Sequence, residues 1–293
     1  MRIALLGFGL IGGSIARALR ERGSPGPAER IVAWSPSGDG PAVAARDGVI
    51  DEAAASPEAA IADADLVILA GPAPVCLEQL DQLAGSWRSS LAPDAVISDV
   101  ASSKSAIVAR AVELGLRFVG GHPMAGRETA GYGAAEPDLF EGRPWVIVPG
   151  AADAAAVGRV EDLARAVGAQ TRRMAPEDHD AAVAAISHLP LVMAAALVEA
   201  VAGTTSAPRD GWNDASALAA TGWRDMTRLA RGDAAMGSGM LTTNAGPVAG
   251  RIRDLVAVLE AWLVDLDGPD GPDARSIDRR LRGARERIEA DGR

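Results

Sequence analysis

Short apolar runs rich in β-branched residues alternate with alanine-rich helical patterns along the first half of the chain. The runs are typical of buried strands, and the amphipathic stretches between most of them are typical of helices. Such alternation predicts a mostly parallel sheet with helices on both faces. The expected strands are 2–6, 30–34, 66–70, 95–99, 117–120, 145–148 and 170–174, with helices between them that include 14–22, 74–83 and 103–114.

The pattern changes after Met174, where helical periodicity continues and no convincing strand follows. Gly- and Pro-rich breaks at 203–212, 237–239 and 267–272 separate the helical stretches. We therefore expect an α/β domain of the Rossmann type over residues 1–174 and an all-α domain over residues 175–293. The helices expected in the second domain are 181–201, 214–220, 225–231, 248–265 and 274–289.

Charge and cysteine content narrow the class of protein. The formal net charge of −10 gives no sign of the basic patch that a nucleic-acid partner would require. Cys76 is the only cysteine, which fits a reducing compartment, and the chain opens on a strand rather than a leader peptide. The apolar stretch 181–201 contains His188 and Glu199, so we interpret it as a buried helix rather than a membrane span. A cytoplasmic protein that handles a small molecule is the expectation.

A glycine-rich turn follows the first expected strand directly. Gly7 allows a tight turn, Gly9 allows close approach of a pyrophosphate, and Gly12 allows close packing of helix on strand. The helix that begins here presents free N–H groups to phosphates. In this position the G-x-G-x-x-G pattern predicts a dinucleotide site. The expected cofactor contacts are Gly7, Gly9, Leu10, Ile11, Gly12 and Ser35.

Ser35 stands at the end of the second strand, where NAD-binding proteins usually carry an acidic residue. Its absence removes repulsion against a 2′-phosphate, but no arginine follows at once and Asp39 lies nearby. NAD and NADP both remain open as the cofactor, and no metal ion is expected.

His122 follows the strand expected at 117–120, in the position that faces the ligand crevice of an α/β sheet. A neutral imidazole there can take a proton from a substrate hydroxyl as hydride leaves. Ser102, after the preceding strand, can bond the same hydroxyl and orient His122. Ser102 or Ser103 can also cap the next helix, and the two roles are compatible. Lys104, the only lysine, can place positive charge near a carboxylate or order the loop.

Polar residues also interrupt the helical half. Ser187 and His188 lie within an apolar helix, where they must bond each other, the backbone or a substrate. Arg224 and Arg228 are four residues apart on one helix face. Either a carboxylate ligand or a surface ion pair is compatible with these arginines.

Taken together, the motifs resemble those of the prephenate/arogenate dehydrogenase family. The resemblance runs in the family's order to about Asn244 and is carried by segments 7–14, 99–104, 122–126, 139–142, 187–190 and 223–228, with Glu128. It implies a homodimer joined by the helical domains. It also implies that His122 is the catalytic base, with Ser102 as its companion, and that Arg224 anchors the ring carboxylate of the substrate. Ser187, His188 and Glu128 would line or gate the pocket.

The resemblance further implies oxidative decarboxylation. Hydride leaves the ring carbon that bears the hydroxyl for NAD(P) while His122 takes the hydroxyl proton. The ring carboxylate then departs as carbon dioxide and the ring becomes aromatic, in a step of tyrosine biosynthesis.

Departures from the family pattern fall near the substrate. Leu191 stands where a second histidine is frequent, and Arg127 stands before Glu128 in place of threonine. Arg127 could compensate for Leu191 by holding the side-chain carboxylate, or it could pair with Glu128 at the surface. Prephenate, arogenate and an amino-substituted relative all remain open as substrates.

Two other functions are compatible with a Rossmann domain followed by a helical domain. One is a dehydrogenase that acts on another cyclohexadienyl or hydroxy-acid substrate, although related β-hydroxyacid dehydrogenases use a lysine in the helical domain, where this chain has none. The other is an NAD(P)-binding protein without catalysis. Such a protein would need neither Ser102, His122 nor Arg224.

Overall fold

A computed structural model describes residues 1–22, 30–127, 129–269 and 271–292. The described chain forms two compact units, Met1–Ala245 and Gly246–Arg293.

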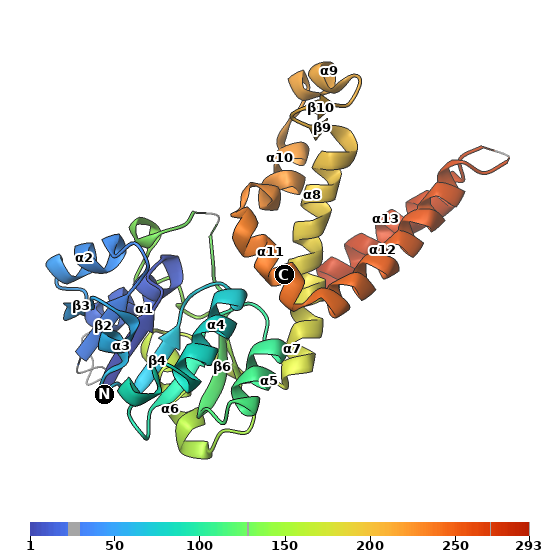
Figure 1. The fold of residues 1–293 in the computed structure, drawn as a ribbon. Helices are drawn as coiled ribbons and strands as arrows, with labels where there is room; N and C mark the ends of the chain where they lie inside the picture. Colours follow the sequence, from blue (N-terminus) through green and yellow to red (C-terminus); the bar gives the residue numbers. More distant parts are fainter. Residues whose placement is uncertain (23–29, 128, 270, 293) are drawn as a thin grey trace. The chain divides into compact units, whose positions relative to one another are not determined.

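The first unit is built on an eight-stranded sheet with strand order β3-β2-β1-β4-β5-β6-β7-β8 (Figure 1). Neighbouring strands are parallel except for the β6–β7 pair. The central strands are apolar and buried on both faces, as in β4, which reads Leu-Val-Ile-Leu and is wholly buried. The strands are β1 (Arg2–Leu6), β2 (Arg30–Trp34), β3 (Glu52–Ala53), β4 (Leu66–Leu69), β5 (Val96–Asp99), β6 (Phe118–Pro123), β7 (Pro144–Val148) and β8 (Gln170–Arg173).

Helices pack on this sheet and enclose two apolar cores. One core includes Ile15 of α1 and Leu163 of α6, and the other includes Leu80 of α4 and Ile107 of α5. The predicted α/β arrangement is therefore confirmed. The helices are α1 (Leu10–Glu21), α2 (Asp39–Arg46), α3 (Pro57–Ile61), α4 (Ala73–Ala84), α5 (Ser105–Glu113) and α6 (Ala154–Ala166).

Strand order reverses direction between β1 and β4. Ligands of open α/β sheets bind in the crevice at the carboxyl ends of the strands on either side of such a switch point. The glycine-rich turn after β1, the end of β5 at Asp99 and His122 near the end of β6 all lie at this carboxyl edge. The fold thus brings the expected cofactor and catalytic segments to one edge.

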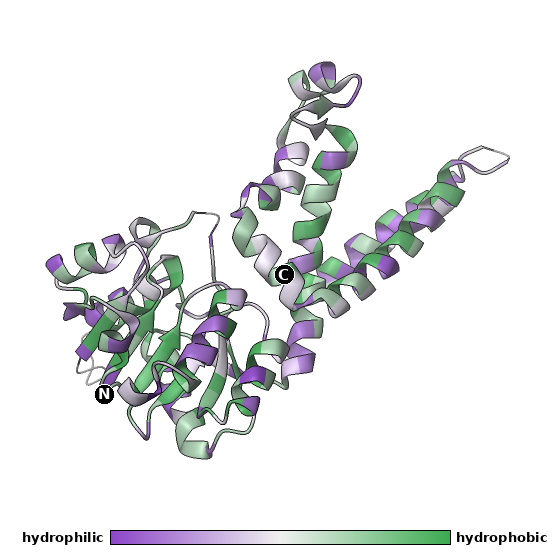
Figure 2. Ribbon diagram, in the orientation of Figure 1, coloured by the Kyte–Doolittle hydropathy of each residue, from purple (hydrophilic) through white to green (hydrophobic). Residues whose placement is uncertain are grey.

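The chain after β8 is almost entirely helical, as predicted. Helix α7 leads through a π-helical turn, Ala184–His188, into α8, which is green over most of its length in Figure 2. The helices of this part are α7 (Pro176–Val183), α8 (Leu189–Val201), α9 (Trp212–Ala217), α10 (Thr221–Thr227) and α11 (Ala234–Thr243).

The break expected at 203–212 is confirmed, because it separates α8 from α9. The expectation that no strand follows Met174 was wrong, since this break contains a short antiparallel hairpin, β9 (Gly203–Thr204) with β10 (Ala207–Pro208). The break expected at 237–239 is instead the middle of α11. The glycines there serve packing, because a Cβ on Gly239 would lie 2.9 Å from Cδ of Pro74 on α4.

The second unit consists mainly of α12 (Ala245–Leu266), which begins one residue before it, and α13 (Ala274–Ala290). Arg280 of α13 bonds Asp265 of α12 and lies over the ring of Trp262, 5.6 Å from its centroid. The two helices therefore pack on each other through the face of α12 that carries Trp262 and Asp265.

Candidate active site

The glycine-rich turn has the geometry of a dinucleotide cradle. Gly7 has φ +105°, and a Cβ there would lie 2.7 Å from the carbonyl carbon of Ala70 after β4. A Cβ on Gly12 would lie 2.5 Å from the carbonyl oxygen of Gly7. A Cβ on Gly9, in contrast, would meet no described atom within 4 Å. Gly7 and Gly12 are thus required by the fold, whereas Gly9 leaves space for a ligand.

Helix α1 begins at Leu10 with Gly9 as its N-cap residue, and no side chain caps it. No acidic residue occupies its first turn. The N–H groups of this turn, which includes Leu10, Ile11 and Gly12, and the positive end of the helix dipole suit a pyrophosphate. Ser35 follows β2 directly and is half-buried. The residues present therefore fit NAD(P).

A buried ion pair organises the loop after β5. The ammonium of Lys104 is paired with Asp99, and both side chains are fully buried. The carboxylate of Asp99 also accepts the backbone N–H of Ala101 and that of Gly121, each at 3.0 Å. Asp99 thereby ties β5 to β6 just before His122. This geometry favours the loop-ordering role of Lys104 over direct contact with a substrate.

His122 is half-buried and lies in a chain of hydrogen bonds that crosses from the sheet to α7. Its Nδ1 lies 2.8 Å from Nε2 of His179, and Nδ1 of His179 lies 2.9 Å from Oδ1 of Asp180. The two imidazole rings meet edge to face, with an interplanar angle of 77°.

The chain of hydrogen bonds from His122 through His179 to Asp180 determines which nitrogen of His122 can act as a base. A carboxylate only accepts hydrogen bonds, so His179 donates from Nδ1 to Asp180. When His179 is neutral, its Nε2 accepts, and the proton of His122 therefore resides on Nδ1. Nε2 of His122 then carries a lone pair. The hydrogen bonds select the tautomer that a general base needs.

The pKa of His122 is held well below its usual 6.5, first by burial and then by the positive charge that His179, Lys104 and His188 can bring near it. Burial opposes the charge of Asp180, but hydrogen bonds from His179 and from Ser105 outweigh it and lower the pKa of that carboxyl. Both shifts therefore favour the forms that suit this chain of hydrogen bonds, a neutral His122 and an ionised Asp180.

Asp180 also caps α5. Its carboxylate accepts the backbone N–H of Lys104 at 2.7 Å and that of Ser105 at 2.8 Å. No side chain of the preceding loop caps this helix, so the expectation of a cap from Ser102 or Ser103 was wrong. A residue of α7 provides the cap because Asp180 is buried against the helix start.

His188 closes the π-helical turn and is fully buried. Such turns often occur at functional sites. Its Nδ1 lies 3.1 Å from the amide nitrogen of Asn244, which also donates to the backbone carbonyl of Asp180 at 2.9 Å. Nε2 of His188 is buried and has no hydrogen-bond partner among the described residues.

Comparison with known proteins assigns the chain to a family. Residues 15–173 match the model of the prephenate dehydrogenase nucleotide-binding domain, and residues 175–265 match that of the prephenate dehydrogenase dimerization domain. The chain belongs to the prephenate dehydrogenase family. The predicted family and the predicted class of enzyme, an NAD(P)-dependent dehydrogenase, are confirmed.

Individual relatives agree. A prephenate dehydrogenase of Bacillus subtilis is 34% identical over 269 residues, covering 90% of this chain and 68% of that protein. The structure of Synechocystis arogenate dehydrogenase is 31% identical, with 98% of this chain and 100% of that chain covered and a TM-score of 0.77. That of Aquifex aeolicus prephenate dehydrogenase, in complex with hydroxyphenyl propionate and NAD+, is 26% identical, with 99% and 98% covered and a TM-score of 0.83.

The other residues expected at the site of this family member are less tightly held. Ser102 and Ser187 are half-buried, and no hydrogen bond joins Ser102 to His122 in the described chain. Arg224 on α10 is exposed, and its guanidinium pairs with no described carboxylate. An unpaired guanidinium is suited to an anionic ligand. Glu128 lies outside the described residues.

Arg127 is exposed and pairs with Glu136, with 2.6 Å between Nη1 and Oε1. The backbone N–H of Glu136 donates to Ser14 Oγ on α1. Arg127 therefore links its loop to the helix of the nucleotide cradle. Its proposed contact with a substrate carboxylate stays a prediction.

Sequence reasoning missed three residues of the site: His179, Asp180 and Asn244. The neighbours His179 and Asp180 near the start of the first helical segment offered a signal, because buried His-Asp pairs set tautomers. Asn244 offered none, since its partners are 56 and 64 residues away along the chain.

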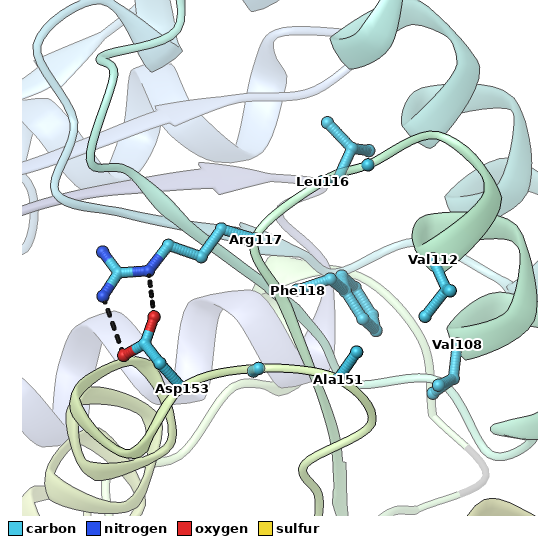
Figure 3. Close-up of a pocket in the computed structure, with 9 residues that line it drawn as sticks. Val108, Val112, Leu116, Arg117, Phe118, Ala151 and Asp153 are labelled. Atoms are coloured by element: carbon cyan, nitrogen blue, oxygen red, sulfur yellow. Dashed lines mark hydrogen bonds and ion pairs between the residues drawn. The ribbon is translucent and has the colours of Figure 1, made fainter.

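A hollow of about 320 Å³ lies elsewhere, between the end of α5, the start of β6 and the start of α6 (Figure 3). Its polar rim is the Arg117–Asp153 ion pair, and Asp153 also caps α6 through the N–H of Ala156. The hydrogen bond from Arg117 holds the pKa of Asp153 far below its usual value. Arg117 and Asp153 therefore have structural roles. The hollow adjoins the amino end of β6, opposite the edge that carries His122.

Proposed function

We propose that this protein oxidises and decarboxylates prephenate or arogenate with transfer of hydride to NAD(P), as a cytoplasmic enzyme of tyrosine biosynthesis. The observation that carries the proposal is the His122–His179–Asp180 chain at the carboxyl edge of the sheet. It leaves a basic nitrogen at the edge that also carries the nucleotide cradle.

Each residue of the site has its own role in this reaction. When bound, the nicotinamide accepts a hydride. Nε2 of His122 takes the proton of the substrate hydroxyl, and His179 and Asp180 hold the ring in the tautomer that permits this. The Asp99–Lys104 pair fixes the backbone of β5 and β6 around His122. Correct placement of these groups before reaction is the main contribution of the protein.

Arg224, with its unpaired guanidinium, is the proposed anchor of the ring carboxylate. Ser102 would bond the reacting hydroxyl, and Ser187, His188 and Glu128 would line the pocket. We assign Arg127 to the side-chain carboxylate of the substrate. To bind this carboxylate, the Arg127 guanidinium must release Glu136.

We further propose that the enzyme is a homodimer. Helix stretch Pro176–Val201 is by length and composition apolar enough to cross a membrane, yet it contains the buried Asp180 and His188 of the site. Its exposed apolar residues include Ile186, at 67% exposure. A second copy that covers this surface accounts for its apolar character, since obligate dimer interfaces are large and hydrophobic.

The deciding experiment is an absorbance assay of NADH and NADPH formation, with prephenate and arogenate tested side by side against both cofactors. Turnover of either substrate that is lost in His122→Asn supports the proposal. Cofactor binding without turnover of any cyclohexadienyl substrate would favour the non-catalytic alternative. Turnover of a hydroxy acid alone would favour the other dehydrogenase.

A further inference from the structure

Asn244 and His188 are joined in a way that fixes the direction of their hydrogen bond. The amide of Asn244 faces the backbone carbonyl of Asp180, which can only accept. The group that faces this carbonyl must therefore be the NH₂ of Asn244. The same NH₂ lies 3.1 Å from Nδ1 of His188, so Nδ1 must accept and carries no proton.

A neutral histidine without a proton on Nδ1 carries it on Nε2. Burial lowers the pKa of His188, which favours this neutral form. Nε2 of His188 is therefore an N–H donor that is buried and has no partner among the described residues. An unpaired buried donor is unfavourable, so such a group in a native site calls for a partner from outside the described residues.

His188 lies close enough to His122 that a positive charge on His188 would lower the pKa of His122. The two rings thus have opposite tautomers within one cluster. His122 presents a lone pair at Nε2, and His188 presents an N–H at Nε2.

We propose that Asn244 is a positioning residue that locks His188 in the Nε2–H tautomer, so that His188 donates a hydrogen bond to an oxygen of the acidic substrate. The tautomer follows from the geometry of the described residues alone. The substrate contact rests on the proposed function.

The tautomer can be read directly, because the chain contains only three histidines. Long-range ¹H–¹⁵N spectra of the full-length protein without substrate report which ring nitrogens carry protons, and the signals missing in His188→Gln assign His188. We expect His188 with Nε2 protonated and Nδ1 unprotonated. In Asn244→Asp, which replaces the NH₂ donor with an acceptor of the same shape, Nδ1 should become protonated.

Thr242→Ala is the matched control, since among the described residues the Thr242 hydroxyl bonds only carbonyls of its own helix, α11. It should leave all three histidine patterns unchanged. Unchanged signals of His122 and His179 in Asn244→Asp would show that the fold is retained. A wild-type His188 protonated on Nδ1, or an unaltered His188 in Asn244→Asp, would overturn the role of Asn244.

The substrate contact is tested by two replacements of His188. The amide nitrogen of glutamine can occupy the place of Nε2, whereas that of asparagine reaches only the place of Nδ1. We expect His188→Asn to raise the substrate KM about tenfold more than His188→Gln does, with little change in cofactor KM. Equal substrate KM values would refute the contact. Absence of turnover in the wild type would instead refute the proposed function, while the spectra would still decide the role of Asn244.

Discussion

The reactivity of His122 depends on what surrounds each of its two ring nitrogens. Nδ1 is occupied by His179, and the proton it carries leaves Nε2 free to accept another. We predict that His122→Asn lowers kcat about 100-fold or more and leaves cofactor binding intact, because a general base contributes on this scale. Steady-state kinetics and NAD(P) titration are the measurements. A kcat close to that of the wild type would remove His122 from the mechanism.

The lowered pKa of His122 has a consequence for pH dependence. The base must be neutral, and burial together with nearby positive charge keeps it neutral below its ordinary pKa of 6.5. We predict that the acid limb of kcat/KM falls below pH 6.5. The profile of log kcat/KM against pH measures this limb, and His122→Asn should lack it. A limb at or above pH 6.5 would contradict the prediction.

Single residues show what sequence can and cannot predict. His122, Lys104 and the glycines were identified because each follows a strand, and the carboxyl ends of strands are where α/β sheets bind ligands. His179, Asp180 and Asn244 act across the boundary between sheet and helices. Their roles depend on the packing of α7 against α5 and of α11 against α4, which no local pattern encodes. The sequence left open whether Lys104 meets a substrate carboxylate or orders the loop, because its burial against Asp99 is a tertiary feature.

At the scale of the elements, different glycines in the turn between β1 and α1 serve folding and cofactor binding. Gly12→Ala should destabilise the protein and weaken cofactor binding, because its Cβ would meet the Gly7 carbonyl at 2.5 Å. Gly9→Ala should keep the wild-type melting temperature and raise the NAD(P) KM about tenfold or more, since only a ligand would meet the added methyl group. Thermal melts and cofactor kinetics test the pair. Equal effects of the two substitutions on stability would contradict this division.

Helices α5 and α7 depend on each other through Asp180. Its carboxylate accepts the backbone N–H groups of Lys104 and Ser105 at the start of α5 and the ring N–H of His179. We predict that Asp180→Asn lowers the free energy of unfolding by about 1.5–3 kcal/mol, because an amide puts donors against donors. It should also lower kcat through His122.

Asp178→Asn makes the same chemical change on the exposed side of α7 and serves as the control. Denaturant unfolding and kcat of both variants decide the matter. If Asp180→Asn and Asp178→Asn had the same free energy of unfolding, the hydrogen bonds of Asp180 to α5 would not stabilise the protein.

At the scale of the elements, periodicity located most strands and helices to within a few residues. It failed for α11, because the glycines at 237 and 239 looked like a break, whereas Gly239 serves close packing on Pro74. It also merged α7 and α8 into one helix. The π-helical turn that separates them lies just before Pro190, which lacks an N–H, and it contains His188.

At the scale of the whole molecule, exposed apolar surface indicates a second copy. On α12 the apolar residues Val256, Leu259, Leu263 and Leu266 recur at helical spacing and are 47–62% exposed. This stripe differs from the face that packs on α13 through Trp262 and Asp265. Contiguous exposed apolar surface of this kind marks an interaction site.

We therefore predict a dimer of twice 29.9 kDa by light scattering in detergent-free buffer. Leu263→Glu, at the centre of the stripe, should shift the protein toward monomer, because burial of an unpaired carboxylate at an interface is costly. Val112→Glu on α5 is the control: Val112 is 53% exposed but lies in the nucleotide-binding domain, so this change should leave the dimer intact. A wild-type monomer would refute the dimer itself. A Leu263→Glu protein as dimeric as Val112→Glu would show that the interface lies on other helices, such as the exposed side of α7–α8 around Ile186.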